Sequence, residues 1–192
     1  SSARRRNLLR YWLRSHRVRA PSSRKLAGIV HDVLVAGRDR SLKITLETCE
    51  LRRHRDLLYC MPALPRTASY ESLKWTLPSP IPLPPGLGAL EIQRVYGRAL
   101  ASTKLSSSLQ ISFRKGGEVL KVAHNRPHRA LKKLLQDANV LPWWRARLPF
   151  IYSGEDLVAV GDLWMNAEFL AAADEEGVAI VWRDKPQITA VR

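Results

Sequence analysis

Acidic side chains are scarce in this sequence, which has 17 Asp and Glu residues against 32 Lys and Arg residues. The formal charge of +15 and the isoelectric point of about 10.6 exclude a neutral or acidic protein. An isoelectric point above about 9 is typical of domains that bind nucleic acid. A basic surface that serves only solubility is the alternative interpretation.

Cysteines and long apolar runs are also scarce. Cys49 and Cys60 are the only cysteines, and we expect two free, buried thiols, although a pairing across a hairpin stays open. No run of about 18 apolar residues is present, so we predict no membrane-spanning helix. The basic start lacks the apolar core of a signal peptide, which favours a cytoplasmic protein. Because the chain begins without Met and within a helical pattern, we expect a fragment.

The charge is unevenly distributed along the chain. Residues 1–66 hold 16 basic and 5 acidic side chains, and residues 105–153 hold 9 and 2. Residues 154–192 reverse the balance, with 3 basic and 8 acidic side chains. Two basic units followed by an acidic tail are therefore expected, and the seven prolines of residues 62–88 exclude a helix between those units.

Hydrophobic periodicity predicts an α+β fold. Apolar residues recur at helical spacing over residues 3–15 and from Ser23 to about Ala36. They then alternate with polar residues, as is typical of strands, over residues 42–60. We therefore predict a small helical and β-meander domain over residues 1–62. A Pro-rich connector with short strands follows over residues 63–104, and a second α+β domain, of mixed strands around one basic helix, over residues 105–192.

The stretch from Phe113 to Tyr152 holds most of the candidate binding residues. A helix predicted over His128–Asn139 has an apolar face and a basic face. Cations that could contact phosphates, and so provide affinity without reading sequence, are Arg114, Lys115, Arg129, Lys132, Lys133, Arg145 and Arg147. Trp143 is the candidate for stacking on a base, and we expect only one residue of the pair Trp143 and Trp144 to be buried.

The glycine pair Gly116-Gly117 has two interpretations. It either forms a tight hairpin turn, in which the glycines shape the chain, or offers backbone N–H groups to a phosphate. The first domain adds weaker candidates, because its arginines form either a solvated face or a stripe that follows phosphates. These candidates are Arg10, Arg14, Arg52 and Arg53.

No catalytic or metal site is predicted. Within any one segment the sequence lacks a nucleophile–base pair, and the glycine pair does not match a Walker loop. His124 and His128 have the spacing of two metal ligands on a helix, but no third ligand is evident.

The second basic segment resembles the C-terminal domain of the tRNA(Ile)-lysidine synthetase family. The matching residues are Arg114, Gly116-Gly117-Glu118, Leu131-Lys132-Lys133-Leu134, Pro142-Trp143, Arg145, Arg147-Leu148-Pro149 and Tyr152. The first domain is similar to the substrate-recognition domain of the same family. That weaker likeness is carried by Arg5-Arg6, Trp12-Leu13, Pro21 and Arg52-Arg53.

The resemblance implies a role in tRNA modification. The family uses ATP, with magnesium, to join lysine to the wobble cytidine of an isoleucine tRNA that has a CAU anticodon. The SGGxDS loop of the family's N-terminal adenylation domain is absent from this sequence. The resemblance therefore implies a tRNA-recognition portion that grips the tRNA, with the acceptor stem as the expected contact, and that has no cofactor and no catalytic activity of its own.

Three alternatives stay open. The first is a basic scaffold module that binds acidic protein partners, from which tRNA would displace it only poorly. An enzyme whose site is assembled from residues distant in sequence is the second alternative. The third concerns assembly, because the sequence allows either a monomer or a homodimer.

Overall fold

The computed structural model describes residues 1–35, 42–64, 71–97 and 99–189. The chain divides into two compact units, Ser1–Pro65 and Arg66–Arg192. Both units contain helices and antiparallel strands, so the predicted α+β class is confirmed. No helix within the described residues is long and apolar enough to cross a membrane.

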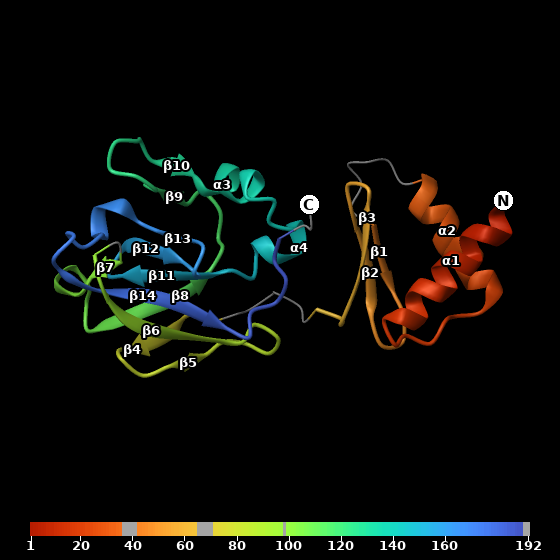
Figure 1. The fold of residues 1–192 in the computed structure, drawn as a ribbon, viewed down its shortest axis with the longest axis horizontal. Helices are drawn as coiled ribbons and strands as arrows, with labels where there is room; N and C mark the ends of the chain where they lie inside the picture. Colours follow the sequence, from red (N-terminus) through yellow and green to blue (C-terminus); the bar gives the residue numbers. More distant parts are fainter. Residues whose placement is uncertain (36–41, 65–70, 98, 190–192) are drawn as a thin grey trace. The chain divides into compact units, whose positions relative to one another are not determined.

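The first unit is a pair of helices packed on one face of a three-stranded meander (Figure 1). Its elements are α1 (Ser2–Ser15), α2 (Ser23–Val35), β1 (Leu42–Thr45), β2 (Glu50–His54) and β3 (Leu57–Met61). A turn at Arg55-Asp56 joins β2 to β3, and Arg55 adopts a positive φ of 54°. The helices and strands agree with the prediction to within a few residues, except that residues 36–41 lie outside the described part of the chain.

The core of the first unit uses only part of each predicted apolar stripe. Leu9 and Leu13 of α1 and Leu26 and Ile29 of α2 are buried against the sheet. Leu8 and Leu34, which adjoin these residues in the helical apolar pattern, are exposed. They lie at the edge of a stripe that is wider than the contact between helices and sheet, so they remain on the surface.

The two cysteines of the first unit are free, as predicted. Cys49 is buried, whereas Cys60 is only partly buried, so the prediction that both thiols are buried holds for Cys49 alone. Burial, a hydrogen bond with Cys49 and the proximity of that thiol raise the pKa of Cys60 to about 12. Cys60 is therefore a protonated, unreactive thiol at neutral pH.

The second unit contains two larger antiparallel sheets (Figure 1). The five-stranded sheet has the order β13-β12-β11-β8-β4, and the four-stranded sheet has the order β5-β6-β14-β7. The strands of the first sheet are β4 (Leu73–Thr76), β8 (Ser108–Phe113), β11 (Pro149–Ser153), β12 (Asp156–Val160) and β13 (Trp164–Met165). Those of the second are β5 (Ile81–Pro82), β6 (Ala89–Tyr96), β7 (Leu100–Ala101) and β14 (Glu176–Arg183).

A close approach joins the two sheets. Gly161, which ends β12 at a φ of 51°, lies against the ring of Trp182 in β14, and an added Cβ there would come within 2.9 Å of that ring. The indole N–H of Trp182 donates to the carbonyl oxygen of Leu87 at 2.5 Å. The core therefore forms between the sheets.

The prediction that residues 63–104 form a separate Pro-rich connector is wrong. Strand β4 pairs with β8 in register Leu73↔Ile111, and β6 pairs with β14 along its whole length. Trp75 and Leu90, from the same segment, are buried. The prolines lie mostly in turns and in the edge strand β5, where a missing N–H is tolerated. Residues 71–104 are thus part of the second unit.

Short helices lie at the periphery of the second unit rather than at its centre. Helix α3 (Leu131–Asp137) is shorter than predicted, because Arg129–Ala130 form strand β10, which pairs with β9 (Val119–Leu120). Helix α4 is Pro142–Arg145, and the 3-10 turns are η1 (Ser102–Lys104) and η2 (Ala167–Phe169). The prediction of strands around one basic helix is therefore corrected: the described pairings are antiparallel, and α3 lies beside the sheets (Figure 1).

Candidate nucleic-acid interface

Helix α3 presents the two faces that its sequence predicts. Leu131, Leu134 and Leu135 are buried, while Lys132 and Lys133 are exposed. Neither ammonium group has a hydrogen-bond or ion-pair partner among the described residues, so both can bind an anion without first breaking an internal contact.

Arg129 differs from these lysines, because its guanidinium is already paired. It donates to Asp137 at 2.6 Å, across the length of α3. Both side chains are substantially exposed, and an exposed pair of this kind contributes at most about 1 kcal/mol. Arg129 can therefore exchange Asp137 for a phosphate, at a small cost.

The glycine turn is closed by an internal carboxylate. Glu118 Oε1 accepts hydrogen bonds from the backbone N–H groups of Lys115 and Gly116, both at 2.7 Å. Gly116 and Gly117 adopt φ angles of 103° and 86°, which favour glycine. The N–H groups of Lys115 and Gly116 are thus occupied by an internal acceptor, and the structure favours the turn-shaping interpretation of this motif.

Arg114 and Lys115, which precede the glycine turn, differ in how free their side chains are to bind a phosphate. The Arg114 Nε atom is 3.8 Å from Glu118 Oε2, which partly neutralises its guanidinium. Lys115 is exposed, and its side chain has no partner among the described residues. Lys115 is therefore the stronger candidate for a phosphate contact.

A backbone hydrogen bond brings the glycine turn and α3 together. The N–H of Leu131 donates to the carbonyl oxygen of Glu118 at 2.9 Å. Because Leu131 is the first residue of α3, this bond places Lys132 and Lys133 beside the turn that carries Lys115. The structure therefore joins cations that are 17 residues apart in the sequence.

The tryptophan pair belongs to the core, which corrects the prediction that one ring would be partly exposed. Trp143 and Trp144 are only 8% and 6% exposed. Both belong to the short helix α4, which begins at Pro142. Trp143 is therefore not available to stack on a base.

Two arginines that follow α3, Arg145 and Arg147, form hydrogen bonds with the backbone of the second unit. Arg147 is 9% exposed, and its guanidinium donates to the carbonyl oxygen of Trp143 at 2.6 Å. Arg145, which is partly exposed, donates from Nε to the carbonyl oxygen of Val140 at 2.9 Å. Arg147 is therefore a weaker candidate for a phosphate contact than the exposed lysines, because its guanidinium is buried and bound to the backbone.

The arginines of β2 in the first unit are engaged as well. Two nitrogens of Arg52 donate to Glu50 Oε2, at 2.9 and 2.7 Å, and Lys43 pairs with Glu50 Oε1 at 2.8 Å. Arg53 donates to the carbonyl oxygens of Val33 and Arg55. These contacts tie α2 and the sheet together, so a structural role explains Arg52 and Arg53.

Glu50 is the buried charge of this network. Burial by itself would raise its pKa, but hydrogen bonds from Lys43 and Arg52, together with their positive charges, hold the pKa below its usual value. The carboxylate is therefore ionised at neutral pH, and the ion pairs contribute to the stability of the first unit.

Arg10 and Arg14, the candidates on α1, differ from one another. Arg10 donates to Asn7 at 2.7 Å and to Ser23 at 3.4 Å, which connects α1 with the start of α2. Arg14 is exposed and has no side-chain partner among the described residues. Arg14 is thus the better candidate for RNA.

Arg126 is an exposed cation of the second unit that sequence reasoning did not include among the candidates. Arg126 lies in the loop between β9 and β10, which the sequence places only as a polar, Pro-containing stretch. The signal was the HNRPH segment itself, because a proline beside charged residues is typical of a protruding loop. His128, in the same loop, lies 3.6 Å from Glu168. Within the described residues, no group of three or more potential metal ligands is found.

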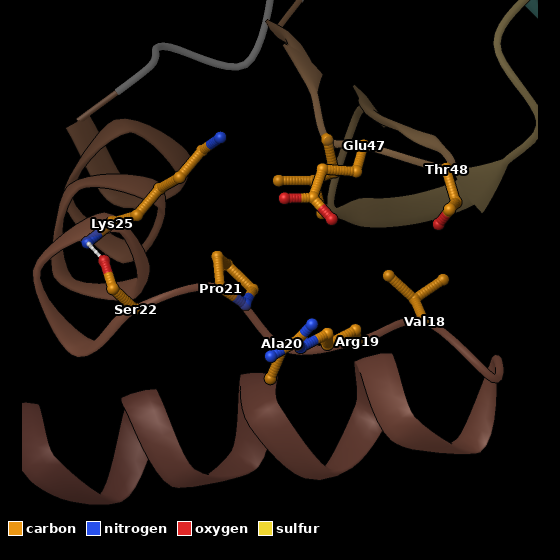
Figure 2. Close-up of a pocket in the computed structure, with 9 residues that line it drawn as sticks. Val18, Arg19, Ala20, Pro21, Ser22, Lys25, Glu47 and Thr48 are labelled. Atoms are coloured by element: carbon orange, nitrogen blue, oxygen red, sulfur yellow. Dashed lines mark hydrogen bonds between the residues drawn. The ribbon is translucent and has the colours of Figure 1, made fainter.

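The first unit also contains a cavity of about 360 Å³, shown in Figure 2. Arg19 and Lys25 line it together with Glu47, and so do the uncharged residues Val18, Ala20, Pro21, Ser22, Leu46 and Thr48. The Ser22 hydroxyl accepts a hydrogen bond from the Lys25 N–H at 3.3 Å and so caps the start of α2. The charges of the cavity are mixed, and none of the cations predicted to contact tRNA lines it.

Comparison with known proteins identifies both units. Residues 1–59 match the family model of the TilS substrate binding domain, and residues 109–182 match that of the TilS substrate C-terminal domain. A solved structure titled "Crystal structure of TILS C-terminal domain" covers 59% of this chain and 98% of its own, with 16% identity and a TM-score of 0.42, too low to bear on fold or function.

Curated relatives match nearly the whole chain. The tRNA(Ile)-lysidine synthase of Coxiella burnetii is 34% identical over 91% of this chain, and that of Alkalilimnicola ehrlichii is 36% identical over 89%. The alignments cover only 39% and 38% of those proteins, so the chain spans about two fifths of their length. With two domain models of one family matched in order, the chain belongs to the tRNA(Ile)-lysidine synthase (TilS) family.

Proposed function

We propose that this chain is the tRNA-binding portion of a cytoplasmic tRNA(Ile)-lysidine synthase. The complete enzyme uses ATP, with magnesium, to join lysine to the wobble cytidine of a tRNA(Ile) that has a CAU anticodon. The adenylation loop of that reaction has no counterpart in this sequence. The chain alone is therefore expected to bind tRNA, to require no cofactor and to form no lysidine.

The observation that supports this proposal is the group of free cations beside the glycine turn. Lys115, Lys132 and Lys133 are exposed and unpaired among the described residues, and the hydrogen bond from Leu131 to Glu118 holds their two segments together. Arg129 adds a fourth cation that is only weakly engaged. Double-stranded RNA is recognised mostly through phosphates, 2′-hydroxyls and shape, which suits a grip on the acceptor stem.

The buried residues of the same segment explain how the grip is held in place. Arg147 donates to the Trp143 carbonyl oxygen of α4, both tryptophans are buried, and Glu118 closes the turn. The backbone that carries the lysines is thus held by internal contacts, so the entropy lost when RNA binds is mainly that of the lysine side chains.

The test is the binding of the 192-residue chain to the CAU-anticodon tRNA(Ile) and to a methionine tRNA, over a salt series. Lys132→Ala combined with Lys133→Ala should weaken binding and reduce the slope of log affinity against log salt by about 0.9 for each lost phosphate contact. Lys74→Ala removes an exposed lysine from β4, on the other side of the second unit from α3 (Figure 1), and should change neither quantity.

The outcomes separate the proposal from its alternatives. Tighter binding of tRNA(Ile) than of the methionine tRNA would mean that these units contribute to discrimination, and equal binding would mean that they provide grip only. An absence of binding to both tRNAs would reject the proposed function and leave the scaffold interpretation. Light scattering of the same chain would show whether it is a monomer or a homodimer.

A further inference from the structure

Helix α1 has a charge arrangement that is unfavourable for an isolated helix. Its 14 residues include five arginines and no acidic residue. Three of these, Arg4, Arg5 and Arg6, lie near the N-terminus, where the helix macrodipole favours negative charge. Arg6, Arg10 and Arg14 follow each other at intervals of four, so like charges are neighbours. A polyanion bound to this helix would relieve both effects.

The outward face of α1 carries an exposed aromatic ring between two of these arginines. At 100° per residue, Tyr11 lies opposite the buried Leu9 and Leu13. Its side chain is 73% exposed. Arg4 precedes it by two helical turns and Arg14 follows it by one, so all three side chains share one face.

The two flanking arginines are free to bind a ligand. Arg4 and Arg14 are exposed, and neither guanidinium has a partner among the described residues. Their neighbours are engaged, because Arg6 donates to Ser2 at 3.0 Å and Arg10 donates to Asn7. Arg4 and Arg14 are thus unpaired arginines on the face of the exposed ring, whereas Arg5, which also has no side-chain partner among the described residues, lies on another face of the helix.

We propose that Tyr11, Arg4 and Arg14 form a second RNA-binding site, in which Tyr11 stacks on an unpaired nucleotide and the two arginines contact phosphates of the same strand. Aromatic planes between cations are a common means of holding unstacked bases. The inference rests on the proposed function, since the ligand is the same tRNA. It goes further, because it assigns base stacking to the first unit. Trp143 of the second unit is buried and cannot stack on a base.

Exposure of an aromatic ring alone does not make such a site. Tyr96, at the end of β6, is 76% exposed, but it faces Glu176 in the sheet register. Arg94, on the same strand, is paired with Glu176 at 3.3 Å. Tyr96 therefore lacks a pair of free flanking arginines, which makes it the matched control for Tyr11.

The test compares Tyr11→Ala, Tyr11→Phe and Tyr96→Ala in the 192-residue chain, with folding checked by circular dichroism. Tyr11→Ala should weaken binding of the CAU-anticodon tRNA about tenfold. The salt slope should stay unchanged, because the ring has no charge. Tyr11→Phe and Tyr96→Ala should bind like the unaltered chain. Arg4→Ala combined with Arg14→Ala should lower both affinity and slope.

A blunt-ended RNA duplex without unpaired bases separates base stacking from phosphate contacts. Tyr11→Ala should bind this duplex as tightly as the unaltered chain does. Equal affinity of Tyr11→Ala and the unaltered chain for tRNA would refute the site, and so would an equal loss for tRNA and duplex. If the unaltered chain bound no tRNA, the proposed function itself would fail. Retained tRNA binding with no effect of Tyr11→Ala would leave that function standing and reject only the second site.

Discussion

Glu118 offers the sharpest test of how the binding surface is held together. Its carboxylate accepts two backbone N–H groups, each at 2.7 Å, and lies 3.8 Å from the Arg114 guanidinium. A hydrogen bond to a charged group contributes about 1.5–3 kcal/mol when water cannot replace it. Lys115 and Gly116 are exposed, so water can take over part of this role, and we expect Glu118→Ala to cost about 2 kcal/mol in the free energy of unfolding.

Glu118→Gln is the matched variant. The amide oxygen can still accept both N–H groups, but the attraction to Arg114 is lost, so the expected cost is about 1 kcal/mol. For a unit of this size, each kcal/mol lowers the melting temperature by about 3–4 °C. Thermal unfolding should therefore show a decrease of about 7 °C for the Ala variant and about half of that for the Gln variant.

Tyr152 provides an independent readout of the same carboxylate. Burial raises the pKa of its phenol, and the negative charge of Glu118 raises that pKa further. Glu118→Gln removes the charge and leaves the burial, so the pKa of Tyr152 should fall, as measured from the assigned NMR resonance of its ring during an alkaline titration. An unchanged melting temperature in the Ala variant, or a Tyr152 pKa that does not move, would refute this account of the turn.

Two further predictions concern the stability of the scaffold. Since the folded-state pKa of Glu50 is depressed below its ordinary value of 4.5, its ion pairs stabilise the first unit above about pH 4.5. That stabilisation is lost as the pH falls through the lower folded-state pKa. The difference in the hydrogen-exchange rates of the β2 amides between the unaltered chain and Glu50→Gln should therefore shrink in the same pH range. A difference that persists at low pH would contradict this prediction. Gly88→Ala should cost about 3 kcal/mol, because its φ is 72° and a Cβ there would overlap the Arg183 carbonyl oxygen. Gly28→Ala, in α2 and open to solvent, should stabilise by about 0.5–1 kcal/mol in the same thermal unfolding assay.

Local sequence patterns determined much of the secondary structure. Both helices of the first unit and its hairpin turn at Arg55-Asp56 follow from apolar spacing and turn chemistry, which depend on residues close in the chain. The two faces of α3 were predictable for the same reason. The stretch from residue 71 to 104 was not, because its strands pair with partners far along the chain, and its prolines suggested a linker instead.

The sequence by itself determined that this protein is strongly basic, that its charge lies in two blocks and that these resemble one family of tRNA-modifying enzymes. Only the tertiary structure decided which cations are available. Arg52, Arg53 and Arg147 are held by internal acceptors, whereas Lys115, Lys132 and Lys133 are exposed. The physical reason is that a charged side chain is free or engaged according to what lies opposite it in the fold, and that neighbour comes from a distant part of the chain.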